Sequence, residues 1–254
     1  MTQHWPERLW LVRHGQSEGN VARDVAHLAG HARIELDGRD VDVPLSALGA
    51  EQSKALGKWF DSPDSVSKPD VLLTSPYVRA MQTARYFQNA GGAAQDQLIC
   101  MDERLREKEF GILDGLTTSG VGLHYPDQAE FRLILGKFYH RPPGGESWCD
   151  VILRLRSLMD TVSLHYGGRR VMIIAHQVVV LCLRYVIENL DEKQILEIDS
   201  QADVANCAVT EYRFDAGKGG DGNLVLERYN DTRHLELMNA AITRAPDPII
   251  GARG

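Results

Sequence analysis

The sequence predicts an α/β fold, a single three-layer domain with a mostly parallel sheet flanked by helices. Short apolar runs at residues 9–12, 71–74 and 171–174 are continuous rather than alternating, which indicates strands buried on both faces. Segments with helical spacing separate these runs, as in sheets whose strands are joined by crossover helices. No internal repeat or linker divides the chain. We therefore expect one domain over residues 1–254, with an inserted lid at about 112–146.

The N-terminal part predicts the first strand and the first helix. Residues 9–12 form the strand, and Arg13-His-Gly15 turns the chain at its end. Residues 20–44 are charged, contain glycines and show no clear period, so we expect a long surface connection there. Ser46 then caps a helix, because its hydroxyl suits the N-cap and apolar residues follow at helical spacing.

A serine and a proline punctuate the end of the second strand, residues 71–74. Ser75 suits an N-cap and Pro76 the first helical position, so a helix is expected to start there and to run through about residue 89. A short strand near residues 98–101 follows.

The segment 102–146 is expected to be irregular, because glycines and a Pro-Pro-Gly-Gly run interrupt it. Ser147 with Asp150 three residues later resembles a capping box, and an apolar helix follows.

The C-terminal part predicts three further strands. Residues 171–174 form a buried strand that ends, like the first one, in a histidine, His176, and another apolar helix follows. Residues 207–214 and 224–229 are expected to pair across a glycine-rich turn.

Composition and charge exclude several classes of protein. The 254 residues include 28 basic and 35 acidic side chains, a net charge of −7, whereas a nucleic-acid surface gains its affinity from clustered basic charge. The longest apolar stretch, 178–183, is far shorter than the roughly 20 residues of a membrane span. Four scattered cysteines indicate neither a disulfide framework nor a zinc site. Because the N-terminus lacks the pattern of a signal peptide, we expect a cytoplasmic protein.

Polar residues follow all three predicted parallel strands at their carboxyl ends, where open α/β sheets bind ligands. Arg13 and His14 follow the first strand, Ser75 and Arg79 the second, and His176 the third. Guanidinium groups are costly to bury unless an anion meets them, and their planar fork suits phosphate oxygens. A single histidine at such an edge is more often structural, but two histidines with two arginines predict an oxyanion site.

Motifs in the chain resemble, in order, those of the histidine phosphatase superfamily, which includes cofactor-dependent phosphoglycerate mutases. Residues 13–20, Arg-His-Gly-Gln-Ser-Glu-Gly-Asn, are similar to the family signature R-H-G-[EQ]-S-x-x-N. Residues 75–84 resemble its second-arginine motif, residues 105–111 its acid motif, and Ala175-His176 its second-histidine motif. Residues 143–147 resemble a further family segment that precedes a helix.

The resemblance implies a role for each residue. His14 is the expected nucleophile, which attacks phosphorus and becomes a phosphohistidine. Arg13, Arg79 and His176 are expected to bind the phosphoryl oxygens and to oppose the charge of the transition state. Glu107 is the expected proton donor to the leaving oxygen, and it then takes a proton from water. An imidazole must be neutral to attack, which its ordinary pKa near 6.5 allows.

Some assignments leave alternatives open. Glu103 and Glu109 compete with Glu107, which we prefer for its position in the acid motif. Gln177 stands where the family usually has a glycine, so its amide could still bind substrate or its side chain could narrow the pocket. Asn20 is a candidate phosphate contact from the first loop, or a turn residue.

No metal or other cofactor is expected. His27 and His31 lie four residues apart, as metal ligands on a helix can, but a solvated loop without a third ligand is the expected state. The expected partner is a small anionic, phosphorylated substrate, with neither nucleic acid nor membrane. A homo-oligomer stays open, because Ile249 and Ile250 suit either a partner contact or a frayed tail.

We expect a metal-independent, histidine-type acid phosphatase, a phosphomonoesterase that hydrolyses a small phosphorylated metabolite. The alternative is a cofactor-dependent phosphoglycerate mutase, in which a second substrate hydroxyl receives the phosphoryl group. Mutases of this family use extra basic groups in the inserted segment. Here the segment offers Arg132, Lys137, His140 and Arg141, without the paired arginines and proline run of a mutase. A further alternative is a non-catalytic module that binds a phosphate ligand, although every catalytic role has a candidate residue.

Overall fold

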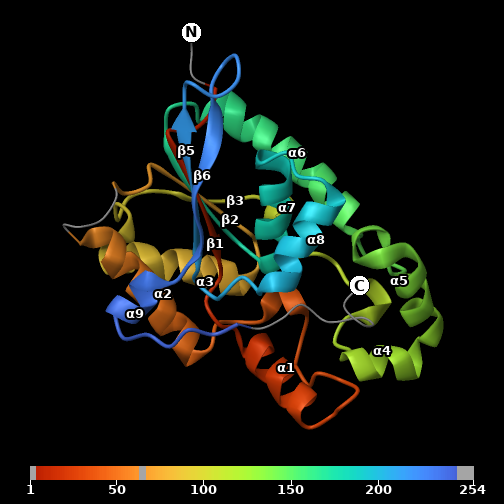
Figure 1. The fold of residues 1–254 in the computed structure, drawn as a ribbon. Coiled ribbons are helices and arrows are strands. Elements are labelled where there is room, and N and C mark those ends of the chain that lie inside the picture. Colours follow the sequence, from red (N-terminus) through yellow and green to blue (C-terminus); the bar gives the residue numbers. More distant parts are fainter. Residues whose placement is uncertain (1–3, 63–66, 245–254) are drawn as a thin grey trace.

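A six-stranded sheet forms the middle layer of the molecule in the computed structural model, which describes residues 4–62 and 67–244 (Figure 1). The strand order is β3-β2-β4-β1-β5-β6 for the strands β1 (Arg8–Arg13), β2 (Val71–Thr74), β3 (Ile99–Met101), β4 (Arg170–Ala175), β5 (Val209–Asp215) and β6 (Asn223–Asp231). Strands β1 to β4 are parallel to their neighbours among themselves, whereas β5 and β6 pair antiparallel at one edge. The α/β class and the mostly parallel sheet predicted from the sequence are confirmed, and so is the C-terminal strand pair.

Helices cover both faces of this sheet (Figure 1). One face carries α6 (Trp148–His165), α7 (Gln177–Ile187) and α8 (Glu192–Gln201), and the other carries α2 (Ala47–Asp61), α3 (Val78–Phe87) and the short α9 (Arg233–Leu237).

The two faces of the sheet build two apolar cores. On β1, Leu9 and Leu11 pack with α6 and α7, whereas Trp10 and Val12 pack with α2 and α3. Successive side chains of a strand point to opposite faces, and here both faces are covered. This double burial is the reason why the strands appear as continuous apolar runs in the sequence.

The register of the strands brings the predicted site residues to one edge. Arg13 pairs with Ala175 across β1 and β4, and Thr74 pairs with Ile174 across β2 and β4. The residues that follow these strands therefore leave the sheet at the same level, where open α/β sheets bind their ligands.

Both serine caps predicted for the long helices are confirmed. The Ser46 hydroxyl accepts a hydrogen bond from the Gly49 N–H at the start of α2. At α6, the Ser147 hydroxyl accepts from the Asp150 N–H while the Asp150 carboxylate accepts from the Ser147 N–H, which completes a capping box.

The expected loop at residues 20–44 is partly helical, so that prediction was wrong. Helix α1 (Glu18–Leu28) occupies its first part, capped by Ser17, and a 3₁₀ turn lies at Asp40–Asp42. The larger apolar side chains of α1 point outward: Val21, Val25 and Leu28 are exposed, whereas the small Ala26 is buried. Because the helix turns little apolar surface toward a core, the usual core-facing period is missing from its sequence.

The segment 102–146 is also more regular than expected. It contains α4 (Thr118–His124) and α5 (Pro126–Tyr139) after two 3₁₀ turns. Glycine positions misled the prediction: Gly136 lies inside α5 with a φ of +75°, which breaks the helical geometry without ending the assigned element. Whether this segment moves as a lid stays a prediction.

Helix α3 begins later than expected. Its N-cap is Tyr77 and its first residue is Val78, so Ser75 is not the cap that the Ser-Pro pattern suggested. The Ser75 hydroxyl instead faces His176 across the sheet edge. Tertiary contact thus overrode a local capping signal.

Three further sequence expectations concern single residues or segments. Cys182 is buried and reduced, as expected, and the other three cysteines are free as well. Among the described residues no helix has both the length and the apolar character needed to cross a membrane. Ile249 and Ile250 lie outside the described residues.

Candidate active site

The backbone after β1 fixes the position and the tautomer of His14. The His14 N–H donates to the Ala175 carbonyl at 2.9 Å, which ties the residue to the neighbouring strand. Its ring Nδ1 lies 2.7 Å from the Gly15 carbonyl oxygen. A carbonyl can only accept, so Nδ1 carries the proton and Nε2 keeps its lone pair. The buried ring therefore presents a neutral nucleophilic nitrogen to the pocket.

Gly15 is required by the close approach of α2 to this turn. A Cβ atom at this position would lie 2.5 Å from the Gly49 carbonyl oxygen, closer than packing allows. The Gly15 N–H donates to the Thr83 hydroxyl of α3 at 3.0 Å. Two helices thus clamp the Arg-His-Gly turn, which explains why the motif needs glycine.

The second histidine faces the first across the strand edge. His176 is fully buried, and its ring centroid lies 5.1 Å from that of His14. Its Nε2 lies 2.7 Å from the Ser75 hydroxyl, and its Nδ1 lies 3.8 Å from a carboxylate oxygen of Glu107. Within the described part of the chain, this Nδ1 has no hydrogen-bond partner. With the Ser75 hydroxyl as the donor to Nε2, the ring proton of His176 lies on Nδ1, and a buried N–H of this kind suits an oxyanion that arrives with the substrate.

Burial and positive neighbours keep both histidines neutral. Burial is the largest cause that lowers the pKa of His14 well below 6.5, and the nearby Arg79 and Arg13 lower it further. The pKa of His176 is lowered well below 6.5 by burial and then by Arg79. Charged imidazoles would repel the guanidinium groups beside them in a poorly hydrated site. His14 is thus neutral at neutral pH, as a nucleophile must be.

Arg13 is held by a side chain that the family resemblance did not anticipate. Its Nη1 donates to the Gln177 side-chain oxygen at 2.8 Å and also to the Val204 carbonyl. Gln177 is buried, and its amide nitrogen donates to Asp203 at 3.2 Å. The Gln177 side chain is therefore directed at Arg13, so it orients the guanidinium rather than narrowing the pocket.

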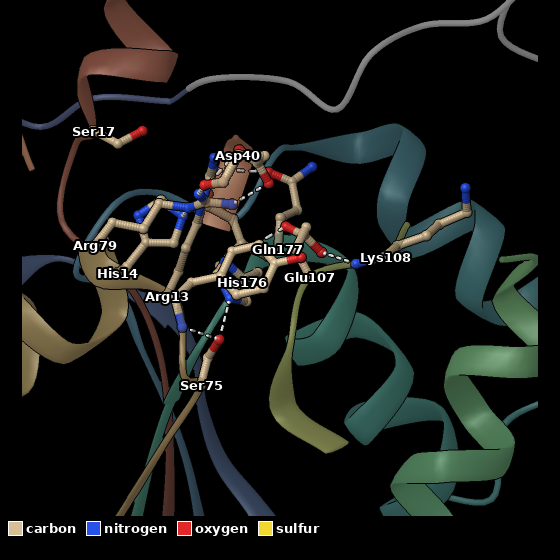
Figure 2. A network of polar contacts seen from close by, with 12 residues as sticks. Arg13, His14, Ser17, Asp40, Ser75, Arg79, Glu107, Lys108, His176 and Gln177 are labelled. Atoms are coloured by element: carbon tan, nitrogen blue, oxygen red, sulfur yellow. Dashed lines mark hydrogen bonds and ion pairs between the residues drawn. The ribbon is translucent and has the colours of Figure 1, made fainter. Parts of the chain in front are cut away.

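Arg79 reaches into the site from the first turn of α3. The side chain is buried, and its Nε donates to His14 Nε2 at 3.3 Å (Figure 2). Its two terminal nitrogens donate to Asp40, which comes from the 3₁₀ turn before α2. The Arg79 guanidinium also lies 4.8 Å from the ring centroid of Tyr77. Arg79 is thus positioned on the nucleophilic side of His14.

Glu107 is the acidic residue of its segment that enters the pocket. It is half-buried, one of its oxygens accepts from the Lys108 N–H at 2.8 Å, and the other faces His176 (Figure 2). Glu103 and Glu109 are exposed, and neither lines the cavity. The geometry therefore favours Glu107 over its two competitors as the candidate proton donor.

Asn20 combines a structural role with a place in the pocket. Its side-chain oxygen accepts from the Ser17 N–H at 3.0 Å, which completes the capping box of α1. Asn206 also donates to this oxygen, at 3.3 Å, and donates to the His14 carbonyl. The side-chain oxygen is thereby occupied, and any contact of Asn20 with a substrate is left to its amide nitrogen.

A cavity of about 260 Å³ is lined by Arg13, His14, Asn20, Arg79 and Glu107, whereas the buried His176 and Gln177 are not among its lining residues. Its size suits a small phosphorylated molecule rather than a polymer. Among the described residues no group of three histidine, cysteine, aspartate or glutamate side chains could hold a metal ion. The cavity is lined by Arg13, His14, Ser17, Gly19, Asn20, Arg23, Ile34, Leu36, Gly38, Asp40, Val43, Arg79, Glu107, Phe110, Leu113, Asp114, Gly115 and Leu116.

Two polar residues of the site, Asp40 and Asp114, went unrecognised in the sequence, and Ser75, which the sequence placed at the sheet edge, was given the wrong role. Ser75 was assigned to a helix cap, although it contacts His176. Asp40 and Asp114 both line the cavity, yet they lie in segments that were expected to be irregular. A carboxylate in a loop is ordinarily solvated, so nothing in the local pattern marks either residue.

The basic residues of the inserted segment lie away from the cavity. Lys137 pairs with Asp199 at 2.6 Å, and Arg141 forms an ion pair with Asp150. Arg132, Lys137, His140 and Arg141 are not among the residues that line the pocket. His27 lies on α1, which corrects the expected loop at that position, and His31 lies beyond its C-terminal end.

A strand edge that gathers two neutral imidazoles and two guanidinium groups defines an α/β protein built to bind a phosphoryl group. The chain belongs to the histidine phosphatase superfamily (branch 1), whose family model matches residues 9–232. It is 30% identical to a 2,3-bisphosphoglycerate-dependent phosphoglycerate mutase of Rhizobium meliloti over 193 residues, which cover 75% of this chain and 84% of the relative.

Two solved structures place the fold among phosphatases and related proteins. A mycobacterial glucosyl-3-phosphoglycerate phosphatase, solved with inorganic phosphate, is 23% identical with a TM-score of 0.66, over 90% of this chain and 99% of that one. Bacillus stearothermophilus YhfR is 26% identical with a TM-score of 0.66, over 90% and 98% of the two chains. The superfamily contains phosphatases and mutases, and the fold predicted from the sequence is that of this superfamily.

Proposed function

We propose that the protein is a metal-independent phosphatase that hydrolyses a small phosphomonoester through a phosphohistidine on His14. The observation that supports this best is the pairing of His14 and His176, with ring centroids 5.1 Å apart and Arg79 Nε 3.3 Å from the nucleophilic nitrogen. A tetrahedral oxyanion between these groups would meet donors on several sides, and positioning with electrostatics supplies most of the catalysis in such transfers.

The first half-reaction transfers the phosphoryl group to the enzyme. The lone pair of His14 Nε2 forms a bond to phosphorus as the bond to the ester oxygen breaks. Arg13, Arg79 and His176 oppose the negative charge on the equatorial oxygens. Glu107 donates a proton to the departing oxygen, so the alcohol leaves neutral.

The second half-reaction returns the enzyme to its starting state. Water attacks the phosphorus of the phosphohistidine, and Glu107, now a carboxylate, takes one of its protons. The bond from phosphorus to Nε2 breaks, inorganic phosphate leaves, and His14 is neutral again. One carboxyl group thus serves first as acid and then as base, as the two directions of proton transfer require.

Hydrolysis is favoured over mutase activity by the placement of the basic residues. A mutase must hold a bisphosphorylated intermediate, so it needs cations beyond those that bind the transferred group. Here Lys137 and Arg141 form ion pairs with Asp199 and Asp150, outside the cavity, and Arg23 is the cation that lines the cavity in addition to Arg13 and Arg79. The similarity to mutases keeps this activity as the second candidate. A cytoplasmic location stays a prediction from the sequence.

The proposal is tested by phosphate release from an aryl phosphate in the presence of EDTA. The native protein is expected to turn over, and His14→Ala to lose more than about a thousandfold in kcat/KM, because the nucleophile is gone. His27→Ala is the matched control, since His27 lies on α1 and does not line the cavity.

Four outcomes would contradict the proposal. Unchanged activity in His14→Ala would remove the phosphohistidine, and loss of activity on adding EDTA would indicate a metal enzyme. Rapid interconversion of phosphoglycerates with negligible phosphate release would favour the mutase. A protein that binds phosphate without turnover would be a binding module.

A further inference from the structure

Asp40 holds the buried guanidinium of the pocket with three hydrogen bonds. Arg79 Nη1 donates to the Asp40 carbonyl at 2.7 Å and to its Oδ1 at 3.0 Å, and Nη2 donates to Oδ2 at 2.9 Å (Figure 2). A two-pronged pairing of this kind is also how a guanidinium group binds phosphate. The Asp40 carboxylate therefore accepts hydrogen bonds from the same Arg79 nitrogens that would bind a phosphoryl group at His14.

The two partners of this ion pair differ in their exposure to water. The Arg79 side chain is 6% exposed, whereas that of Asp40 is 41% exposed. Asp40 lies in a short 3₁₀ turn that follows Gly38, and its carboxylate has access to water. When the ion pair opens, water can solvate the exposed carboxylate of Asp40. The buried guanidinium of Arg79 cannot be solvated in the same way, so it needs another anion in place of Asp40. A dianionic phosphoryl group is such a replacement.

A second carboxylate makes the same cavity unfavourable for additional anions. Asp114 lines the pocket with Asp40. Burial is the largest cause that raises the pKa of Asp114, and the negative charge of Asp40 raises it further, whereas Arg79 and Arg23 lower it. The rest of the lining combines the guanidinium of Arg23 and the polar Ser17 and Asn20 with apolar side chains, which are Ile34, Leu36, Val43, Phe110, Leu113 and Leu116.

We propose that Asp40 selects substrates by charge, as a specificity-determining residue. The phosphoryl group displaces it from Arg79, and the displaced carboxylate stays at the pocket wall with Asp114. There it repels a second anionic group on the leaving alcohol, whereas an uncharged alcohol can contact the apolar side chains of the lining. The inference rests on the proposed function, because it needs a phosphoryl group at His14.

The first part of the test measures the affinity for inorganic phosphate by calorimetry. Asp40→Asn keeps the size of the side chain and removes its charge, so phosphate is expected to bind about tenfold tighter. Asp42→Asn is the matched control: Asp42 lies two residues away, pairs with the exposed Arg39 and does not line the cavity. Phosphate affinity in the control should stay that of the native protein. Unchanged or weaker binding in Asp40→Asn would overturn the proposal and make Asp40 a support for Arg79.

The second part compares glycerol 3-phosphate with 3-phosphoglycerate. The first carries an uncharged hydroxymethyl group where the second carries a carboxylate. Both are titrated into His14→Ala, where turnover should stop. Glycerol 3-phosphate is expected to bind about tenfold tighter, and adding Asp40→Asn should reduce that preference several-fold. A preference that the second substitution leaves unchanged would overturn the proposal.

These measurements separate the two proposals. Phosphate release decides whether the protein is a phosphatase, whereas the affinities are equilibrium quantities and need no turnover. An inactive native protein would refute the proposed function. The two phosphate affinities and the preference between the two ligands would still decide the role of Asp40.

Discussion

At the scale of single residues, a backbone carbonyl and a serine hydroxyl orient the two imidazole rings of this site. The Gly15 carbonyl accepts a hydrogen bond from Nδ1 of His14, which leaves Nε2 unprotonated, and Arg79 of α3 donates to Nε2. His176 rests on the Ser75 hydroxyl. His14 is thus oriented from within its own motif, by Gly15, whereas His176 is oriented by Ser75, which lies outside its motif. Substitution at Ser75 should alter rate before it alters stability.

The first prediction at this scale concerns the protonation of His14. A histidine in water titrates near 6.5, but burial, with Arg79 and Arg13, lowers the pKa of His14 well below that value. As pH falls through 6.5, His14 should therefore stay neutral while a solvated imidazole gains its proton. The measurement is the ¹⁵N imidazole shift followed from about pH 8 to about pH 5, with His14 assigned by comparison with His14→Ala.

The opposite result would be easy to recognise. A His14 ring that is half protonated at or above pH 6.5, or a ring that carries its proton on Nε2, would remove the neutral nucleophile. The acid limb of kcat/KM gives a second readout, since it reports ionisations of the free enzyme and of the free substrate. As pH is lowered, kcat/KM should decrease only where the substrate itself gains a proton, and not at the higher pH where an ordinary histidine would be protonated.

Prediction from sequence at this scale succeeded where a residue type has few uses. Arg13, His14, Arg79 and His176 were assigned from motifs, and the structure gathers them at one edge. Asp40 was not foreseen, because an aspartate in a loop has many uses and only the folded chain brings it to Arg79. The same reason applies to Gln177, whose partner Arg13 lies 164 residues away in sequence.

At the scale of elements, the helix caps are the features that the sequence determines most directly. A cap involves residues three apart, so no long-range contact is needed to form it. Ser46 and Ser147 both cap as predicted, but Ser75 does not, because His176 competes for its hydroxyl. Local patterns hold until a buried partner offers a better hydrogen bond.

The capping box of α6 gives a prediction on stability. In Ser147→Ala the N–H of Asp150 loses its acceptor and the Asp150 carboxylate loses the Ser147 hydroxyl, so the free energy of unfolding should fall by about 1 kcal/mol. Urea denaturation measures the change. Ser163→Ala, in the last turn of the same helix, is the control and should be neutral or slightly stabilising, because alanine is the better helix former. Equal effects of the two substitutions would contradict the capping role.

At the scale of the whole molecule, the central strands carry the fold because they are buried on both faces. Strand β4 lies between β2 and β1, and its residues alternate between the two apolar cores. Val171 and Ile173 belong to one core, and Met172 and Ile174 to the other. A cavity made in either core therefore borders β4, the strand that leads to His176.

A core truncation tests this arrangement. Ile173→Ala should lower the free energy of unfolding by about 2–5 kcal/mol, because a fully buried side chain leaves a cavity that the sheet cannot close. Leu153→Ala, on the solvent side of α6, is the matched control and is expected within about 0.5 kcal/mol of the native value. Guanidinium denaturation followed by tryptophan fluorescence measures both. A small loss at Ile173 would mean that the sheet repacks around the cavity.

The sequence by itself determined the fold class, which candidate site residues follow each of the parallel strands, and the serine caps of α2 and α6. These follow from hydrophobic period, local hydrogen bonding and motifs, all of which can be read along the chain. Only the tertiary structure decided which acidic residue faces His176, what orients Arg13 and what occupies Arg79. Those contacts join residues far apart in sequence, and a loop carboxylate or a buried amide acquires its partner only when the sheet edge forms.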